Sequence, residues 1–313
     1  MNNKITAIFI VAIFLMSFGV VLAADGDVIW KREYDGNGPD YAMGVATDSY
    51  NNVIVTGYSF MGDNLDNLNY CTIKYDAAGN IIWKREYDGG DEDGAKGVAT
   101  DSYNNVIVTG ISEIGGRRSD YCTIKYDPNG NVVWEKEYDS GFDDFANGVA
   151  TDSYNNVIVT GYSIIGGKIR YCTIKYDPNG NIIWKREYDG GDNAGANGVA
   201  TDSYNNVIVT GYSIIGGSPP DYCTIKYDPN GNIIWKREYD GGDEDGAKGV
   251  ATDSYNNVIV TGISEIGGRR SDYCTIKYQG VPPRSKSLPI DKFLKILKRN
   301  RCKNHPDAED CKV

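Results

Sequence analysis

The stretch Gly97-Val98-Ala99-Thr100-Asp101-Ser102-Tyr103-Asn104-Asn105-Val106-Ile107-Val108-Thr109-Gly110 occurs five times in the chain without a change. Its copies begin at Gly44, Gly97, Gly148, Gly198 and Gly249. Tryptophan follows the same rhythm and recurs at Trp30, Trp83, Trp134, Trp184 and Trp235. Self-similarity with a fixed period of about 50 residues indicates an array of repeated structural units.

Each repeat divides into four short runs rich in β-branched and aromatic residues. In the second repeat we expect strands at 97–100, 106–112 and 121–126, together with 81–87. The segment 101–105 suits a tight hairpin, because Asp bonds to the turn backbone and Asn tolerates a positive φ. Asp127-Pro128-Asn129-Gly130 suits a second turn for similar reasons. The pattern therefore predicts four antiparallel strands per repeat.

Four strands in about 50 residues are typical of one blade of a β-propeller. The chain opens with a lone fourth strand, 28–34, and its last repeat ends after the third strand at Tyr278. Because a closed ring has no exposed sheet edges, we expect the first strand to complete the last blade. The sequence predicts an all-β, five-bladed β-propeller, and a stacked β-solenoid is the main alternative.

The words Asp-Ser-Tyr-Asn-Asn-Val-Ile-Val-Thr-Gly-Tyr-Ser and Tyr-Asp-Pro-Asn-Gly-Asn-Ile-Ile-Trp resemble the SBBP-type β-propeller repeats of exported prokaryotic proteins. The likeness covers 28–278. The family pattern usually has Gly-Asn where this chain has Asn51-Asn52, which keeps a residue that tolerates positive φ. The family's name implies seven blades rather than five. The resemblance implies a propeller outside the cell or at its surface, and no defined reaction.

The N-terminal segment 1–23 reads as a signal peptide, with Lys4 before an apolar stretch from Ile5 to Leu22. The stretch is long enough that an uncleaved anchor is the alternative. The propeller is expected at 24–280. The signal predicts a secreted or extracytoplasmic protein, in the periplasm or at the cell surface, with no integral membrane domain beyond this segment.

The C-terminal segment 281–313 reads as a linker followed by a short basic amphipathic helix. Its apolar residues Ile290, Phe293, Leu294 and Leu297 share one face. Docking on the acidic propeller and contact with an anionic surface both remain open. We expect a disulfide between Cys302 and Cys311. The five cysteines of the repeat, beginning with Cys71, are expected to be buried free thiols, because equivalent positions on neighbouring blades lie too far apart to bridge.

The chain has a net charge of −11, and the charge is unevenly distributed. Residues 24–283 contain 22 Lys and Arg against 39 Asp and Glu, whereas 284–313 contain 9 against 4. An acidic body repels phosphate backbones, so nucleic acid is not an expected partner. The charge indicates either a solvated surface or cation binding.

Two sets of loops are expected on one face of the propeller: those from the fourth strand to the next blade and those from the second strand to the third. The first set is acidic and Gly-rich, and the second differs most between repeats. Such carboxylates can hold Ca²⁺ or serve only as turn formers. With Tyr58, Tyr162 and Tyr212 nearby in sequence, the variable loops suit shallow sites that use aromatic stacking and amide hydrogen bonds, as sugar-binding surfaces do; drift in tolerant loops is the alternative. The candidate ligand-binding residues are Asp91, Glu92, Asp93, Arg117, Arg118, Asp143, Asp144, Asp192, Asp243, Glu244, Asp245, Arg269 and Arg270.

Catalysis is not expected, because a nearly symmetric ring offers five similar environments and the single histidine, His305, lies in the tail. No catalytic residue and no cofactor other than possible Ca²⁺ is predicted. The sequence favours a non-enzymatic binding or adhesion protein that recognises carbohydrate, or a protein partner, at several similar sites. The alternatives are a polysaccharide-active glycoside hydrolase and a purely structural repeat protein of the cell surface.

Overall fold

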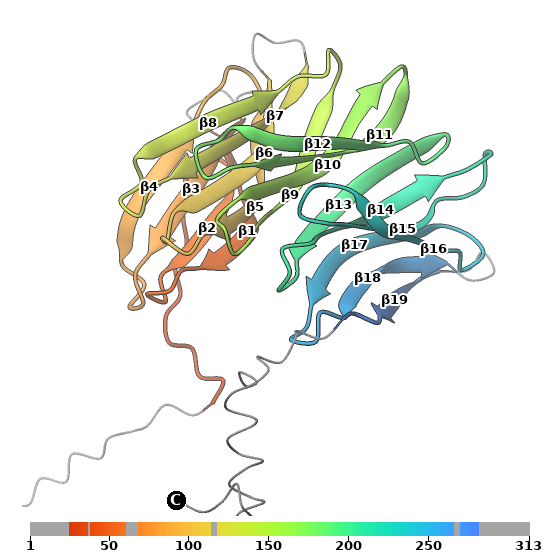
Figure 1. Cartoon of the computed structure of the whole chain (residues 1–313). Coiled ribbons are helices and arrows are strands. Elements are labelled where there is room, and N and C mark those ends of the chain that lie inside the picture. The colour runs from red at the N-terminus through yellow and green to blue at the C-terminus, as the bar shows by residue number, and fades with distance from the viewer. Residues whose placement is uncertain (1–24, 37, 61–67, 114–117, 266–269, 282–313) are drawn as a thin grey trace, which may run out of the picture.

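The computed structural model describes residues 25–36, 38–60, 68–113, 118–265 and 270–281, and these residues form five antiparallel sheets (Figure 1). The first sheet contains β1 (Asp40–Thr47), β2 (Val53–Phe60), β3 (Leu68–Tyr75) and β4 (Ile81–Tyr87). The second contains β5 (Asp93–Thr100), β6 (Val106–Glu113), β7 (Ser119–Tyr126) and β8 (Val132–Tyr138). The third contains β9 (Asp144–Thr151), β10 (Val157–Ile165), β11 (Lys168–Tyr176) and β12 (Ile182–Tyr188). The fourth contains β13 (Asn193–Thr201), β14 (Val207–Ile214), β15 (Asp221–Tyr227) and β16 (Ile233–Tyr239). The fifth contains β17 (Asp245–Thr252), β18 (Val258–Glu265) and β19 (Ser271–Tyr278).

Each sheet is a meander whose strands pair in chain order, as the repeat pattern predicted. The first strands of successive sheets contact one another in the order β1, β5, β9, β13 and β17. Figure 1 shows these strands near the middle of the molecule, with the later strands of each sheet lying farther out. The arrangement is that of propeller blades, and it does not resemble the stacked solenoid kept as an alternative.

The first strand of each blade begins earlier than the sequence indicated. We expected the strand of the second repeat to begin at Gly97, whereas β5 begins at Asp93. The pairing of β5 with β6 shifts register between Ala95 and Gly97, and this bulge lets the strand continue through the glycine. In consequence Asp93, Asp144 and Asp245 are buried strand residues and not loop residues.

The hydrophobic core lies between neighbouring blades. One cluster joins Ile107, Tyr121 and Trp134 of the second blade to the third blade. The residues that the third blade contributes are Ala146, Val157, Val159, Cys172, Ile174 and Tyr176. Cys122, Cys172 and Cys223 are fully buried and unpaired, which confirms the prediction for these thiols. The repeated tryptophans pack between blades, as their position on the fourth strand indicated.

Polar contacts between blades repeat with the same period. Tyr121 donates a hydrogen bond to the carbonyl oxygen of Cys172 at 3.0 Å, and Trp134 Nε1 donates to that of Pro178 at 3.0 Å. Thr151 Oγ1 donates to the carbonyl oxygen of Thr100 at 2.9 Å. These bonds satisfy side chains that the apolar interface would otherwise leave unpaired.

A buried ion pair that was not expected from the sequence recurs inside the blades. Lys125 lies on the third strand, within a sequence that is typical of a core strand. Its Nζ is nevertheless 2.8 Å from Asp101 Oδ2. The exposed fractions of the two side chains are 3% and 0%. Burial of two charges is stable only because the pair and its hydrogen bonds compensate the loss of water.

The ring closure expected from the sequence is not seen among the described residues. The segment 28–34 has no strand assignment, and β19 has no fourth strand beside it. Tyr273 on β19 is 97% exposed, whereas its counterpart Tyr222 on the fourth blade is fully buried. The last blade thus presents an unpaired edge among the described residues, and the segment expected to cover it contacts the first blade.

Several predictions from the sequence lie outside the described residues. These are the signal peptide at 1–23, the disulfide between Cys302 and Cys311, the C-terminal helix in 281–313, and the side chains of Arg117 and Arg269. Within the described part, no helix is long and apolar enough to cross a membrane.

The buried ion pairs can be tested by comparing Lys175→Met with Lys185→Met. Lys175 is 2.8 Å from buried Asp152, so its loss leaves an uncompensated buried charge and is expected to lower the free energy of unfolding by about 3–5 kcal/mol. Lys185 forms a surface pair with Glu187, so its loss is expected to change stability by about 1 kcal/mol or less. Chemical denaturation measures both, and equal losses would contradict a structural role for the buried pairs.

Candidate functional site

The two loop sets that were expected on one face do lie together. The loop that leads into β5 is held against the end of β6, because Asp91 N donates to the Glu113 carbonyl at 3.1 Å and Glu113 N donates to that of Glu92 at 3.0 Å. The same contact recurs where Ile164 N donates to the Asp143 carbonyl at 3.0 Å. We call this side of the molecule the loop face, and the opposite side, formed by the two kinds of hairpin turn, the turn face.

The predicted site residues differ in their exposure on the loop face. Asp91, Glu92, Glu244, Arg118 and Arg270 are exposed, whereas Asp143, Asp192 and Asp243 are half-buried. Asp93, Asp144 and Asp245 are buried. The structure therefore does not assemble these residues into one site; it distributes them between exposed loops and the clefts between blades.

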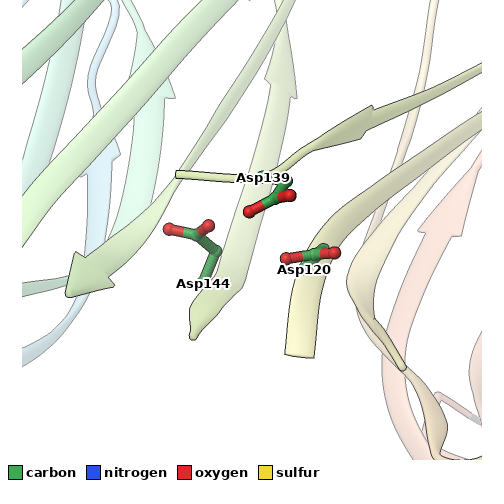
Figure 2. A group of neighbouring side chains, drawn as sticks. All are labelled: Asp120, Asp139 and Asp144. Atoms are coloured by element: carbon green, nitrogen blue, oxygen red, sulfur yellow. The ribbon is translucent and has the colours of Figure 1, made fainter. Parts of the chain in front are cut away.

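Two groups of three carboxylates occupy such clefts. In the first, Asp120 on β7, Asp139 after β8 and Asp144 at the start of β9 each place one oxygen within 4.8 Å of the others (Figure 2). In the second, Asp221, Asp240 and Asp245 repeat the arrangement two blades further on. Asp120, Asp139, Asp221 and Asp240 were not among the residues predicted from the sequence, because nothing local shows that the start of one strand meets the end of the next.

The first cluster is electrostatically unfavourable as it stands. Burial, together with the negative charges of neighbouring carboxylates, raises the pKa of Asp120 to about 6. Those neighbours are Asp139, Asp144, Glu137 and Asp143. Burial likewise raises the pKa of Asp221, with Asp240 and Asp245 contributing. Neighbouring negative charges and a low dielectric both disfavour ionised carboxylates, so each cluster favours a proton or a cation.

The equivalent cleft between the third and fourth blades is built differently. Arg170 replaces the first aspartate and Ala194 replaces the buried one. The Arg170 guanidinium contacts Asp189 at 2.5 Å and lowers the pKa of that carboxyl group. Between the first and second blades, Asn69 stands in the first position. The clefts therefore share a framework and differ in charge.

Aromatic side chains on the loop face pack in pairs within blades. The rings of Tyr41 and Tyr58 lie 5.0 Å apart, and those of Phe145 and Tyr162 lie 4.8 Å apart in a stacked arrangement. Their mutual contact uses part of the ring surface that the sequence assigned to ligand stacking. Tyr58, Tyr162 and Tyr212 are half-buried.

The turn face carries the aromatic array that the sequence reasoning missed. The hairpin turn between the first and second strands places one tyrosine in solvent in four of the blades. These are Tyr50, Tyr103, Tyr154 and Tyr255, with exposed fractions of 71%, 69%, 69% and 63%. The exposed rings stand one to a turn, at the same position in each of these repeats. The tyrosine of this turn is identical in all five repeats. That invariance, and not only the turn-forming residues, is the feature of the sequence that indicates the array.

Each exposed tyrosine stands on a rigid turn. The Asp101 carboxylate accepts hydrogen bonds from the backbone N–H groups of Tyr103 and Asn105 and from the Asn105 side chain. The buried Lys125 ammonium binds the same carboxylate. Asn104 adopts a φ of 63°, and the equivalent asparagines have values between 61° and 63°. This confirms the prediction that Asn supplies the positive φ at this point.

Neighbouring turns are bonded to each other across the blade boundaries. Ser49 N donates to Asn104 Oδ1 at 2.9 Å, and Ser102 N donates to Asn155 Oδ1 at 2.8 Å. The same bond joins the third blade to the fourth and the fourth to the fifth. Tyr50, Tyr103 and Tyr154 are therefore displayed at fixed separations on three successive blades, and we call this row, together with Tyr255, the track. The corresponding residue of the fourth blade, Tyr204, is half-buried.

Known proteins resemble this chain in part. No family model matches it. An uncharacterized WD repeat-containing protein of Acanthamoeba polyphaga mimivirus is 30% identical over 140 residues, which are 45% of this chain and 8% of that protein. The chain thus spans a small part of this curated relative. The likeness to SBBP-type repeats stays a prediction.

Solved structures that resemble the chain are 8–14% identical to it in sequence. A gluconolactonase of Xanthomonas campestris has a TM-score of 0.41, with 71% of this chain and 69% of that chain covered. The Pan2 WD40 domain of Neurospora crassa has a TM-score of 0.40, with 72% and 75% covered. A GH43_1 enzyme of Xanthomonas citri has a TM-score of 0.42, with 71% and 81% covered.

The turn geometry predicts different effects for two substitutions at Asn104. Asn104→Gly removes the bond to Ser49 but accepts the φ of 63°, whereas Asn104→Ala removes the bond and strains the backbone. Asn104→Ala is expected to be less stable than Asn104→Gly by about 1–2 kcal/mol. Thermal and chemical denaturation measure the difference, and equal stability of the two variants would show that the left-handed backbone is unimportant here.

Proposed function

We propose that the protein is a non-enzymatic, extracytoplasmic binding protein that recognises carbohydrate at several equivalent positions. The observation that carries this proposal is the track of exposed tyrosines on the turn face, each held by an identical turn. Individually weak contacts gain strength when several are engaged at once by one polymer. A polysaccharide, which repeats its own chemical groups, is a natural ligand for a protein surface that repeats.

Tyrosine suits this role because its ring offers a flat apolar surface and its hydroxyl group a hydrogen bond, with only two rotatable bonds to immobilise. The turn beneath each ring adds little further entropy loss, since Asp101 and its counterparts already fix the backbone. The neighbouring asparagines, such as Asn104, are buried and bonded to adjoining turns, so the ring and hydroxyl group of each tyrosine would carry the contact. Preorganised aromatic rings are well matched to sugar rings, which present apolar faces.

This proposal moves the main contact surface from the loop face, where the sequence placed it, to the turn face. On the loop face, Tyr58 and Tyr162 are half-buried and each is paired with another ring, and some of the carboxylates lie in clefts. A protein partner on the loop face, through exposed residues such as Arg118 and Arg270, stays a second candidate. Its variable loops are the part of the molecule that distinguishes one blade from another.

We further propose that the ring closes when the segment 28–34 pairs with β19. The support comes from the first blade, where Trp30 Nε1 donates to the Ala77 carbonyl at 3.2 Å and Arg32 Nε to that of Gly79 at 2.7 Å. Trp83 and Arg85 make the same bonds to the second blade from within β4. The segment therefore already has the position of a fourth strand relative to the blade that follows it.

Both free ends carry unfilled places that closure would fill. A hollow of about 220 Å³ lies beside the first blade, lined by Val55, Gly57 and Ile73 among others. In the other blades the corresponding surface is covered by the preceding blade. At the far end, Tyr273 is exposed, whereas Tyr222 bonds to the carbonyl oxygen of the next blade's cysteine at 3.1 Å. Closure would bring Tyr273 to the first blade in the same way.

The binding proposal is tested with Tyr103→Ala/Tyr154→Ala, which removes two adjacent rings. Residues 24–313 are titrated with soluble xylan, mixed-linkage glucan, pectin and peptidoglycan fragments, and released reducing ends are measured for each ligand bound. Because avidity depends on several contacts, the double variant is expected to bind its polysaccharide at least about tenfold more weakly. Tyr103→Phe/Tyr154→Phe keeps the rings and is expected to retain most of the affinity.

Arg118→Ala serves as the matched control on the loop face and is expected to leave carbohydrate binding unchanged. Loss of affinity in Arg118→Ala but not in the tyrosine variants would return the site to the loop face. Release of reducing ends by the wild-type protein would favour the glycoside hydrolase alternative. Failure to bind any of these polysaccharides would overturn the carbohydrate proposal.

Closure is tested by placing a cysteine opposite Cys274. In the fourth blade Cys223 faces Glu238 across the sheet, so Glu238→Cys is expected to form a disulfide on oxidation and serves as the positive control. By the repeat, Glu33 should face Cys274, so Glu33→Cys is expected to cross-link to Cys274 within one chain. Peptide mapping identifies the pair. Absence of the link in Glu33→Cys, or covalent dimers alone, would contradict closure within the chain.

A further inference from the structure

We propose that the two three-carboxylate clefts, one between the second and third blades and one between the fourth and fifth, are Ca²⁺ sites. The first is formed by Asp120, Asp139 and Asp144, and the second by Asp221, Asp240 and Asp245. The inference is independent of the carbohydrate proposal, since the clefts lie on the loop face and the tyrosines on the turn face.

The geometry of each cleft fits a cation. One oxygen from each of the three carboxylates lies within 4.8 Å of the other two, as oxygens around a shared ion do when metal–oxygen distances are about 2.4 Å. Figure 2 shows the three groups of the first cleft gathered where β7, the end of β8 and the start of β9 meet. The remaining ligands of a six- to eight-coordinate ion would be water, which reaches the exposed Asp139.

The buried aspartate of each cleft has one oxygen without a hydrogen-bond partner among the described residues, a feature that it shares with Asp40 and Asp93 of the first two blades. Asp144 is fully buried, and its Oδ2 accepts a hydrogen bond from Ser140 N at 2.7 Å. Its Oδ1 has no hydrogen-bond partner among the described residues. Asp245, which is 1% exposed, has the same unpaired Oδ1 in the second cleft. A buried, unpaired carboxylate oxygen is costly, and a bound cation would compensate it.

The chain also contains a natural replacement of the proposed ion. In the cleft between the third and fourth blades, Arg170 stands where Asp120 and Asp221 stand, and its guanidinium binds Asp189, the counterpart of Asp139. The buried aspartate is absent there, since Ala194 occupies its position. In this cleft two carboxylates are missing and the positive charge of Arg170 is present. This exchange is expected if a bound cation supplies the positive charge in the other two clefts.

Calcium is the cation that this donor set favours. The ligands are carboxylate oxygens, with no histidine or cysteine among them, which excludes a preference for zinc or copper. The sites join two blades through a Gly-rich connection, and Ca²⁺ tolerates the irregular geometry that such a site provides better than Mg²⁺ does. An ion there would tie β7 and β8 of one blade to β9 of the next, and so stabilise the loop face.

The test is a calorimetric titration of the metal-stripped protein with CaCl₂, with MgCl₂ as a parallel titrant. Asp144→Asn and Asp245→Asn are each expected to reduce the number of bound Ca²⁺ ions by one. Arg170→Asp/Ala194→Asp rebuilds the three-carboxylate set in the third cleft and is expected to add one. Binding with a dissociation constant of about 10⁻⁴ M is typical of extracellular calcium modules.

Asp91→Asn is the matched control, because Asp91 is an exposed acidic residue of the same face that lies outside both clefts. It is expected to leave the number of ions unchanged. Closure of the ring would bring Asp272 to Asp35 and Asp40 and create a further three-carboxylate cleft. The experiment therefore measures how many ions each variant gains or loses relative to the wild type, and not the total number. Circular dichroism and thermal unfolding verify that each variant is folded.

Three results would overturn the proposal: no Ca²⁺ binding by the wild-type protein, binding that survives in Asp144→Asn/Asp245→Asn, or an equal reduction in Asp91→Asn. A preference for Mg²⁺ over Ca²⁺ would overturn the choice of ion. A thermal unfolding temperature that rises with CaCl₂ in the wild type but not in the double variant would support the proposal, since an ion that binds only the folded state stabilises it.

Discussion

Burial of side chains between neighbouring blades is the interaction on which the rest of the structure depends. A single four-stranded sheet of this chain has an apolar face that it cannot cover itself, and the core clusters accordingly combine residues from two blades. The bonds from Tyr121 and Trp134 to backbone carbonyl groups of the next blade add direction to this packing. Each blade is therefore stable only as a neighbour of another, which makes the two ends of the array special.

The buried lysine connects this packing to the turn face. Lys125 and its counterparts extend from a core strand to the carboxylate that organises the turn, so the charge inside the blade and the shape of the turn outside it depend on each other. Such a pair adds little net stability relative to an apolar replacement, but breaking it is strongly destabilising. It explains why the turn word does not vary among the repeats although its tyrosine lies in solvent.

The turn face is regular from blade to blade, whereas the loop face varies. On the turn face, hydrogen bonds between successive turns fix a regular track, so a change in one blade would disturb its neighbour. On the loop face, the contacts between connections differ from blade to blade, as where Asp245 N donates to the Pro220 carbonyl and Lys168 Nζ to that of Gly191, and the loop sequences diverge. The carboxylate clefts lie at the boundary, where the framework is shared but Asn69, Asp120, Arg170 and Asp221 differ in charge at one position. Regularity between blades and individual variation thus lie on opposite sides of the molecule.

The sequence by itself determined the repeat, the four strands of each blade, the antiparallel order and the turn conformations, because these depend on local periodicity and on residues such as Asn104 that tolerate a positive φ. It also indicated which loops share a face. Only the tertiary structure decided that Lys125 is buried in an ion pair, that Tyr103 is exposed, and that Asp120, Asp139 and Asp144 meet in one cleft. Those outcomes depend on contacts between positions far apart in the chain, and a local pattern contains no information about which charges will share a buried space.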